Sequence, residues 1–181
     1  GNTGVAAYGV IANLWFIVVS MFTGISQGMQ PIMSHNYGKG KYGNVNKILK
    51  YGLILMGTFA AAIYAVMFFG SEYVAAIFNS EHNETLQYIA EEGLKLYYIA
   101  CPFVGFNIII SIFFTSTEYP VPAHIISILR GFALIIPMAF IMLFAGGRIG
   151  LWMAFPVTEM IVTVIGIILY IMRNRKLKEH I

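Results

Sequence analysis

The sequence predicts an all-α fold, a polytopic membrane helix bundle with five transmembrane helices. Of its 181 residues, 59% are hydrophobic and only 10% are charged, whereas soluble domains carry roughly 25% charged residues. The charged residues gather in short segments between long uncharged runs, which is the pattern of a chain that crosses a bilayer several times. Helices are expected rather than strands, because the apolar residues are continuous and do not alternate with polar ones.

Five segments are long enough to cross a bilayer, which takes about 20 apolar residues. The first three cover about residues 4–35, 48–78 and 86–117, and the last two cover about residues 123–144 and 149–172. Turn-forming residues separate these segments, namely Gly38, Gly40 and Gly43, the polar run 79–83, Pro120 with Pro122, and Gly146 with Gly147.

Lysine and arginine fall almost entirely on one side when successive loops are assigned to alternate faces. That side receives Lys39, Lys41, Lys47, Lys50, Arg130, Arg173, Arg175, Lys176 and Lys178. The other side receives Arg148, with Lys95 if its side chain extends outward. Because basic residues are retained on the cytoplasmic side, we expect a multi-pass protein of the plasma (inner) membrane with a cytoplasmic C-terminus. An odd number of spans that begins outside without a signal peptide also indicates the C-terminal part of a longer chain.

Glu159 lies near the middle of the last predicted span, with uncharged residues from 149 to 158 and from 160 to 172 on either side. Inserting a carboxylate at that depth costs about 2.5–3.5 kcal/mol or more, so the side chain should face the protein interior or a water-filled cavity. Removal from water favours the neutral form of a carboxyl group, which suits a residue that binds and releases a proton during transport. The alternative is a structural Glu that is hydrogen-bonded to a neighbouring helix.

Amides within the spans form a second group of candidates. Asn107, in the middle of the third span, is expected either to bind an ion or substrate or to link two helices through its amide. Asn13, Gln27 and Gln30 in the first span have the same two interpretations. Gln27 and Gln30 lie three residues apart and share a helix face, and Gln30 precedes Pro31, which removes a backbone hydrogen bond. This combination favours a bend that lines a cavity.

Aromatic side chains are abundant, with 14 Phe and 11 Tyr, and most should contact lipid or pack between helices. A minority, including Phe103 and Phe106, are candidates to line an apolar cavity for flat organic cations, through stacking and cation–π contacts. Tyr97, Tyr98 and Phe155 belong to the same group. Because Tyr97 and Tyr98 are adjacent, at most one of them should face inward.

Several classes of function are not expected. The four histidines and the single cysteine form no metal-ligand set. No nucleophile–base pair and no phosphate-binding loop is recognisable, so we expect neither an enzyme nor a metal site. The lysines and arginines lie at the ends of apolar runs, so the net charge of +3 does not indicate a nucleic-acid partner.

Two segments of the sequence resemble a known family. The run G-V-A-A-Y-G-V-I-A-N-L from residue 4, followed by G-I-S-Q-G-M-Q-P-I-M-S-H-N-Y-G-K-G-K from residue 24, resembles the eighth helix of multidrug and toxin extrusion (MATE) transporters. The segment G-L-W-M-A-F-P-V-T-E, residues 150–159, resembles the start of their twelfth helix, especially in the bacterial multidrug subgroup. By this resemblance, residues 1–181 are a fragment of the C-terminal lobe, helices eight to twelve.

The resemblance implies a twelve-helix fold of two six-helix lobes around a central cavity. It also implies efflux of drugs or small organic cations by antiport with H⁺ or Na⁺ through alternating access, with no cofactor other than the coupling ion. The partners would be the substrate, the lipid bilayer and the missing N-terminal lobe of the same chain. In some members a tenth-helix carboxylate joins a cation site, and by spacing that position falls near Asn107, an amide here, which makes Glu159 the preferred acidic candidate.

Two other functions remain open. The first is a flippase for a lipid-linked sugar, from the same superfamily, which should expose more fixed positive charge in its cavity for a pyrophosphate. The second is a membrane scaffold that does not transport and packs against a partner protein. In such a scaffold, apolar residues should replace Glu159 and the amides with little loss of binding.

Overall fold

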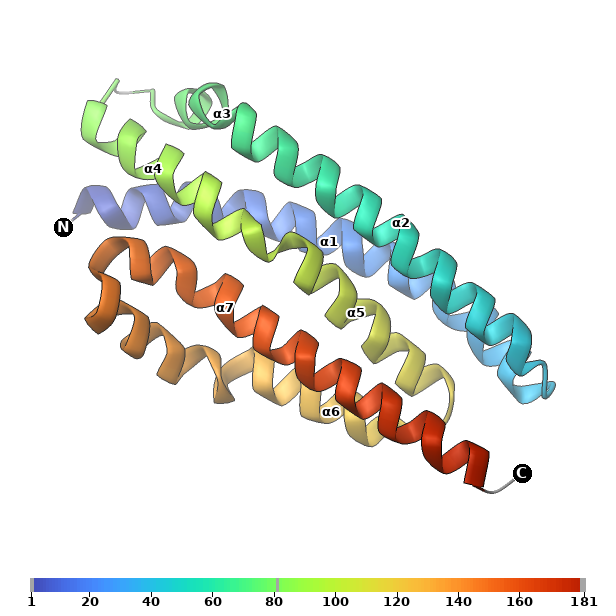
Figure 1. Ribbon diagram of the computed structural model, residues 1–181. Helices are drawn as coiled ribbons and strands as arrows, with labels where there is room; N and C mark the ends of the chain where they lie inside the picture. The colour runs from blue at the N-terminus through green and yellow to red at the C-terminus, as the bar shows by residue number, and fades with distance from the viewer. Residues whose placement is uncertain (1, 81, 180–181) are drawn as a thin grey trace.

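The computed structural model describes residues 2–80 and 82–179, which form a bundle of helices without strands (Figure 1). The α-helices are, in chain order, α1 (Asn2–Gly38), α2 (Tyr42–Phe69), α3 (Ser71–Phe78), α4 (Glu84–Tyr97), α5 (Cys101–Ser116), α6 (Pro120–Ile128) and α7 (Ile135–Glu179). A short 3₁₀-helix, η1 (Tyr98–Ala100), joins α4 to α5, and a π-helix, η2 (Leu129–Ala133), lies between α6 and α7. The prediction of an all-α membrane bundle is confirmed.

Within the described residues, four stretches are long and apolar enough to cross a membrane, whereas the sequence predicts five spans. They are Thr3–Gly38, Tyr42–Phe69, Glu84–Ser116 and Ile135–Asn174. The difference arises in the last third of the chain. There α7 comprises two helices that meet at Gly147, whose backbone has φ 55° and ψ −130° and is not helical, at the separation that the sequence predicts between the fourth and fifth spans. The chain reverses direction at this point, so the two halves of α7 lie side by side as a hairpin (Figure 1).

The second predicted span, residues 48–78, is too long at its C-terminal end. The helix stops at Phe69, and Gly70 separates it from the short helix α3, which turns away from the axis of α2 (Figure 1). A Cβ atom at position 70 would lie 2.7 Å from the Val66 carbonyl oxygen, which accepts a hydrogen bond from the Gly70 N–H at 2.8 Å. Glycine therefore permits a turn here that the uniform hydropathy of the segment does not reveal.

The fourth predicted span, residues 123–144, is not one regular helix but α6, η2 and the first part of α7. The irregularity precedes Pro137, which has no N–H to donate to the carbonyl four residues earlier. The Leu134 N–H instead donates to the carbonyl of Leu129, five residues back, at 3.0 Å. Single π-turns of this kind often mark functional sites, and this one carries Arg130.

Helix α5 is the centre of the bundle, and α1, α2, α6 and α7 all pack against it. Close approach to α2 depends on Gly105, where a Cβ atom would lie 2.5 Å from Met56 Cγ. Most of α5 is buried, whereas the outer faces of α1, α2 and α7 expose large apolar side chains, as expected for surfaces in lipid. A polar residue on α5, such as Asn107, is therefore placed at the most enclosed position of the fold.

Candidate functional site

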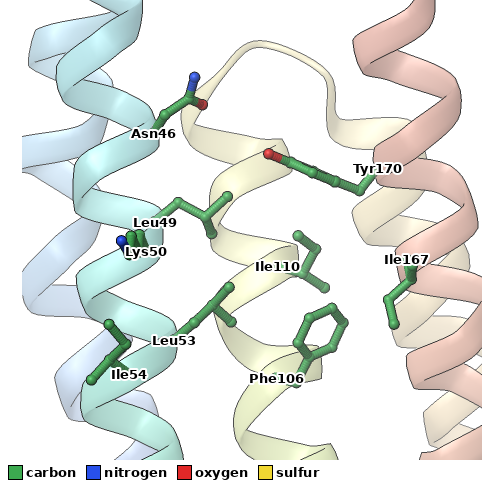
Figure 2. A pocket seen from close by; sticks show the side chains of 9 residues that line it. All are labelled: Asn46, Leu49, Lys50, Leu53, Ile54, Phe106, Ile110, Ile167 and Tyr170. Atoms are coloured by element: carbon green, nitrogen blue, oxygen red, sulfur yellow. The ribbon is translucent and has the colours of Figure 1, made fainter.

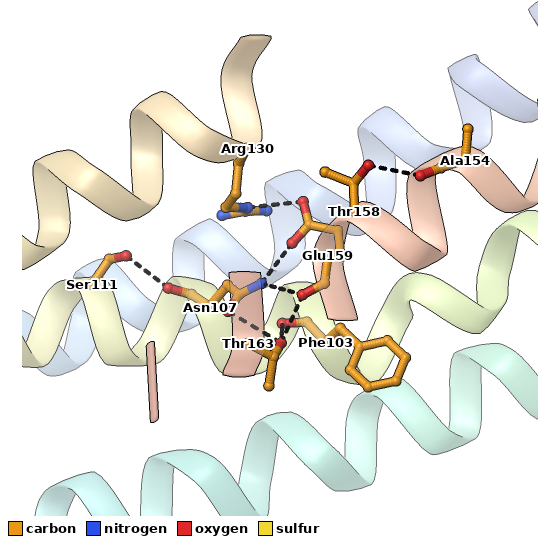
Figure 3. A network of polar contacts seen from close by, with 8 residues as sticks. All are labelled: Phe103, Asn107, Ser111, Arg130, Ala154, Thr158, Glu159 and Thr163. Atoms are coloured by element: carbon orange, nitrogen blue, oxygen red, sulfur yellow. Dashed lines mark hydrogen bonds and ion pairs between the residues drawn. The ribbon is translucent and has the colours of Figure 1, made fainter. Parts of the chain in front are cut away.

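Glu159 and Asn107 are in direct contact at the centre of the bundle (Figure 3). The Asn107 side-chain amide donates to Glu159 Oε2 at 2.7 Å and lies 3.1 Å from the Glu159 backbone carbonyl oxygen. Glu159 is 1% exposed and Asn107 is 0% exposed. The two residues are 52 positions apart in sequence, and the packing of α7 on α5 brings them into one polar site.

Arg130 completes an ion pair with Glu159. Its Nε atom donates to Glu159 Oε1 at 2.8 Å, and the Arg130 side chain is 21% exposed. The sequence counted Arg130 with the charges expected on the cytoplasmic side, whereas in the structure its side chain lies inside the bundle and pairs with Glu159. The pairing offsets part of the cost of burying the Glu159 carboxylate.

Thr163 and Ser111 extend the network around Asn107. The Thr163 hydroxyl lies 3.2 Å from Asn107 Oδ1 and 2.9 Å from the Glu159 backbone carbonyl oxygen. The Ser111 hydroxyl donates to the Asn107 backbone carbonyl at 2.7 Å. Asn107 is therefore held at its amide nitrogen, its amide oxygen and its main chain, which fixes the donor that faces Glu159 (Figure 3).

Both oxygens of the Glu159 carboxylate accept a hydrogen bond, one from a guanidinium and one from an amide. Neither donor can be removed without leaving a buried polar atom unpaired, which costs about 1–3 kcal/mol and more for a charged group. A proton or metal cation that binds Glu159 must therefore displace or weaken the contact to Arg130 or Asn107. We name this set the coupling network: Arg130, Glu159, Asn107, Thr163 and Ser111.

Sequence reasoning missed Arg130 and Thr163 as members of the site. Thr163 follows Glu159 by four residues, which places the two side chains on one helix face. This spacing could have identified Thr163 as a neighbour of Glu159. Arg130 falls inside a predicted span, where a charge needs a partner, and Glu159 is the obvious acid. The pairing itself depends on the packing of α7 near η2, which no local pattern reveals.

The amide candidates on the first helix do not join this network. Asn13 and Gln27 are exposed and Gln30 is half-buried on α1. Asn13, Ser20 and Gln27 follow one another at intervals of seven residues, and all are exposed on one face of α1. This amide face points away from the rest of the described bundle, so the structure separates Asn13 and Gln27 from Glu159. Among the described residues, Gln30 also makes no hydrogen bond to the network.

Two of the aromatic candidates lie on α5, four residues and one residue before Asn107. Phe106 is half-buried and lines a groove between α2, α5 and α7 (Figure 2). Phe103 is also half-buried, and its backbone carbonyl oxygen lies 3.5 Å from the Thr163 hydroxyl. The structure does not bring these two phenylalanines into one cavity with the remaining aromatic candidates.

The other aromatic candidates surround Trp15 on α1. The rings of Tyr97, Tyr98 and Phe155 pack edge-on against it, with centroids 5.4, 5.4 and 5.2 Å away. Both tyrosines contact Trp15, but Tyr97 lines the cavity described next, whereas Tyr98 is fully buried and is not part of its lining. The chain tightens into η1 at Tyr98, and both large rings reach Trp15 from there.

A cavity of about 560 Å³ lies next to this aromatic cluster, between α1, α4 and α7. Its walls include Tyr8, Tyr97, Trp152 and Phe155, with Arg148 at its edge. Tyr97 and Phe155 stack with ring centroids 4.8 Å apart, and Phe155 precedes Glu159 by four residues on the same face of α7. We name this space the aromatic cavity. Its volume is in the range of small-molecule sites. Phe155 in its wall lies about one helical turn from Glu159 of the coupling network.

Thr163→Val should lower the stability of the protein, because it removes the hydroxyl that faces Asn107 Oδ1. The valine side chain has the same shape, and the buried amide oxygen loses its hydrogen bond at a cost of about 1–3 kcal/mol. Thr158→Val is the matched control, because the Thr158 hydroxyl donates only to the Ala154 carbonyl of its own helix. Thermal unfolding of both variants in detergent tests this, and equal melting temperatures would contradict the role of Thr163.

Comparison with known proteins identifies the family. The MatE family model matches residues 1–141. An FAD transporter from Shewanella oneidensis strain MR-1 is 22% identical over 178 residues, which are 96% of this chain and 37% of that protein. The chain thus spans less than two fifths of the length of this curated relative.

Solved structures show the same fold. A transporter of the MOP superfamily from Pyrococcus furiosus Vc1 matches 98% of this chain and 40% of its own, with a TM-score of 0.88 and 18% identity. A multidrug resistance MATE family transporter in its outward-facing conformation matches the same shares, with a TM-score of 0.89 and 17% identity. The expected resemblance to MATE transporters is confirmed, and the match to about two fifths of each structure fits one lobe of such a transporter. The chain belongs to the MatE family of membrane transporters.

Proposed function

We propose that the protein containing this chain exports small organic cations or drugs by antiport with H⁺ or Na⁺ through alternating access. The observation that carries the proposal is the buried coupling network, in which one carboxylate is shared between a guanidinium and an amide. Ionisable groups inside a membrane bundle are costly and commonly mark ion pathways and proton relays. Packing alone gives little reason for an ion pair at this position, because replacing such pairs by apolar residues of similar size is often neutral or stabilising.

In this proposal, Glu159 alternates between Arg130 and the coupling ion. When H⁺ or Na⁺ binds the carboxylate, the attraction to Arg130 weakens and the guanidinium is released. Arg130 lies on η2, a π-helical segment that joins two helices, and such segments bend more readily than regular α-helix. The released Arg130 would therefore shift α6 and the first half of α7 and change the balance between outward-open and inward-open states.

The aromatic cavity is the proposed substrate site of this lobe. Flat organic cations bind well to aromatic faces, and the cavity offers tyrosine, tryptophan and phenylalanine rings. The exposed amide face of α1, with Asn13 and Gln27, would complete the substrate path against the missing N-terminal lobe. Ion and substrate then contact different groups but favour different states of the same lobe, which is sufficient for coupling.

Two observations bear on the other candidate functions. A flippase for a lipid-linked pyrophosphate needs unpaired positive charge in its cavity, whereas Arg130 is paired with Glu159 at 2.8 Å. A passive scaffold has no need for a buried carboxylate.

The relative from S. oneidensis is named an FAD transporter. FAD should therefore be tested as a substrate beside the organic cations, as a flat but anionic molecule. The basic residues at the predicted loops support a plasma-membrane protein with its C-terminus in the cytoplasm.

Dye efflux tests the proposal with the full-length protein in sealed vesicles. A fluorescent organic cation, and separately FAD, should be followed under an imposed pH gradient and under an imposed Na⁺ gradient. Extrusion of the cation under either gradient is the expected result, and the effective gradient identifies the coupling ion. Transport of FAD alone would replace the substrate assignment, and no transport of either by inserted protein would contradict antiport.

A further inference from the structure

The groove between α2, α5 and α7 has the form of a site for a single lipid chain. It has a volume of about 340 Å³, and α5 forms its floor while α2 and α7 form its sides (Figure 2). Leu53, Phe106, Ile110 and Ile167 supply its apolar walls. Ile167 is 41% exposed, so the groove opens toward the outside of the described bundle.

One end of the groove is polar. Asn46 and Tyr170 lie there, near the level of the loop that follows α5, and Lys50 lies further along the groove on α2 (Figure 2). Asn46 and Lys50 are four residues apart near the start of α2, so they lie on one helix face. The Tyr170 ring is held by an edge-on contact with Phe113, with centroids 5.4 Å apart. Asn46 and Tyr170 therefore lie where a lipid headgroup would lie if its acyl chain followed the walls, and the Lys50 ammonium follows one helical turn along α2.

Lys50 has no acidic partner among the described residues, where both ion pairs are made by arginines. Its side chain is exposed, and it stands near the lysines of the preceding loop, on the side that the charge distribution predicts to be cytoplasmic. Anionic lipids give the cytoplasmic leaflet a negative surface potential, and basic pockets between transmembrane helices on that side bind their headgroups. An ammonium, an amide and a hydroxyl together match a phosphate better than they match an uncharged surface.

We propose that this groove binds one anionic phospholipid of the cytoplasmic leaflet, with the phosphate at Lys50, Asn46 and Tyr170 and an acyl chain along the walls. The bound lipid lies against Phe106, which directly precedes Asn107. The lipid would therefore lie within one helical turn of the coupling network along α5, and its binding adds lipid recognition to this lobe. The site requires only that the protein spans a membrane, and it is independent of antiport.

Photo-crosslinking tests this site in the full-length transporter, reconstituted in phosphatidylcholine vesicles. The probe is phosphatidylglycerol with a diazirine in its acyl chain, and the comparison probe is phosphatidylcholine with the same diazirine. Mass spectrometry of the digested protein should locate the phosphatidylglycerol adduct on the groove walls. Lys50→Gln should reduce that adduct about fivefold, the ratio expected for loss of one basic contact to an anionic lipid.

Lys41→Gln is the matched control, because Lys41 carries the same charge next to the same helix but does not line the groove. It should leave labelling of the walls unchanged. Equal labelling by the two probes, or full labelling in Lys50→Gln, would overturn the proposal of an anionic lipid. An absence of adduct on the walls would show that this lipid does not occupy the groove, and would overturn the proposal as well. Labelling requires no transport, so failure of the antiport proposal does not affect this result.

Discussion

Glu159→Gln should destabilise the full-length protein by about 3 kcal/mol, at the lower end of the range for breaking a buried ion pair. The change removes the negative charge that neutralises Arg130, while the guanidinium stays inside the bundle. Its side chain is 21% exposed, so contact with water relieves part of the cost. Thermal unfolding in detergent measures the effect. A melting temperature equal to that of the unaltered protein would contradict a buried ion pair at this position.

The double variant Arg130→Met with Glu159→Met separates stability from function. Replacing a buried ion pair by apolar residues of similar volume is often neutral or stabilising by about 1–4 kcal/mol. Asn107 still lies within hydrogen-bonding distance of the backbone carbonyl of residue 159, at 3.1 Å. The double variant should therefore melt at or above the temperature of the unaltered protein. A double variant less stable than Glu159→Gln would mean that the network holds the fold together.

Gly150→Ala should destabilise the protein by about 3 kcal/mol or more, the upper end of the cost of overpacking. A Cβ atom at position 150 would overlap the Met142 carbonyl oxygen and lie 2.7 Å from its carbon. Both are backbone atoms and cannot rotate away, so the two halves of α7 would have to separate. The second half carries Glu159, and its displacement would also disrupt the coupling network.

Gly146→Ala is the control for this hairpin. A Cβ atom at position 146 has no heavy atom within 4 Å, and Gly146 has no positive φ. Its replacement should leave the melting temperature almost unchanged. Expression, membrane insertion and thermal unfolding of both variants test the prediction. Equal stability of Gly150→Ala and Gly146→Ala would show that the turn does not need the close contact.

Hydropathy and charge could predict the class of fold because bilayer thickness fixes the length of a spanning helix. The turn expected at Gly146 and Gly147 is where the chain reverses within α7, but hydropathy and charge could not predict the break at Gly70 or the π-helix η2. These two features depend on individual backbone hydrogen bonds and on close contacts such as that of Gly70 with Val66. A residue type such as glycine permits a turn or a close approach, but the neighbouring helix decides which one occurs.

The candidate site was predictable in part. Glu159 and Asn107 stand out because a polar group in an apolar span needs a partner, and each turned out to be a partner of the other. Asn13 and Gln27 met the same criterion, yet they lie on an exposed face, because sequence does not reveal which face of a helix packs inward. Arg130 was assigned by position in the chain alone, which is a poor guide to depth when the helix is irregular.

The central proposal is that Glu159 and Arg130 link ion binding to transport. The fold itself should not depend on this ion pair. The most direct test is transport by the double Met variant of the full-length protein, purified and reconstituted in sealed vesicles. Substrate exchange without a gradient should continue, and accumulation driven by the pH or Na⁺ gradient should fall by more than about tenfold, a typical size for an allosteric coupling. Gradient-driven accumulation equal to that of the unaltered protein would contradict the claim.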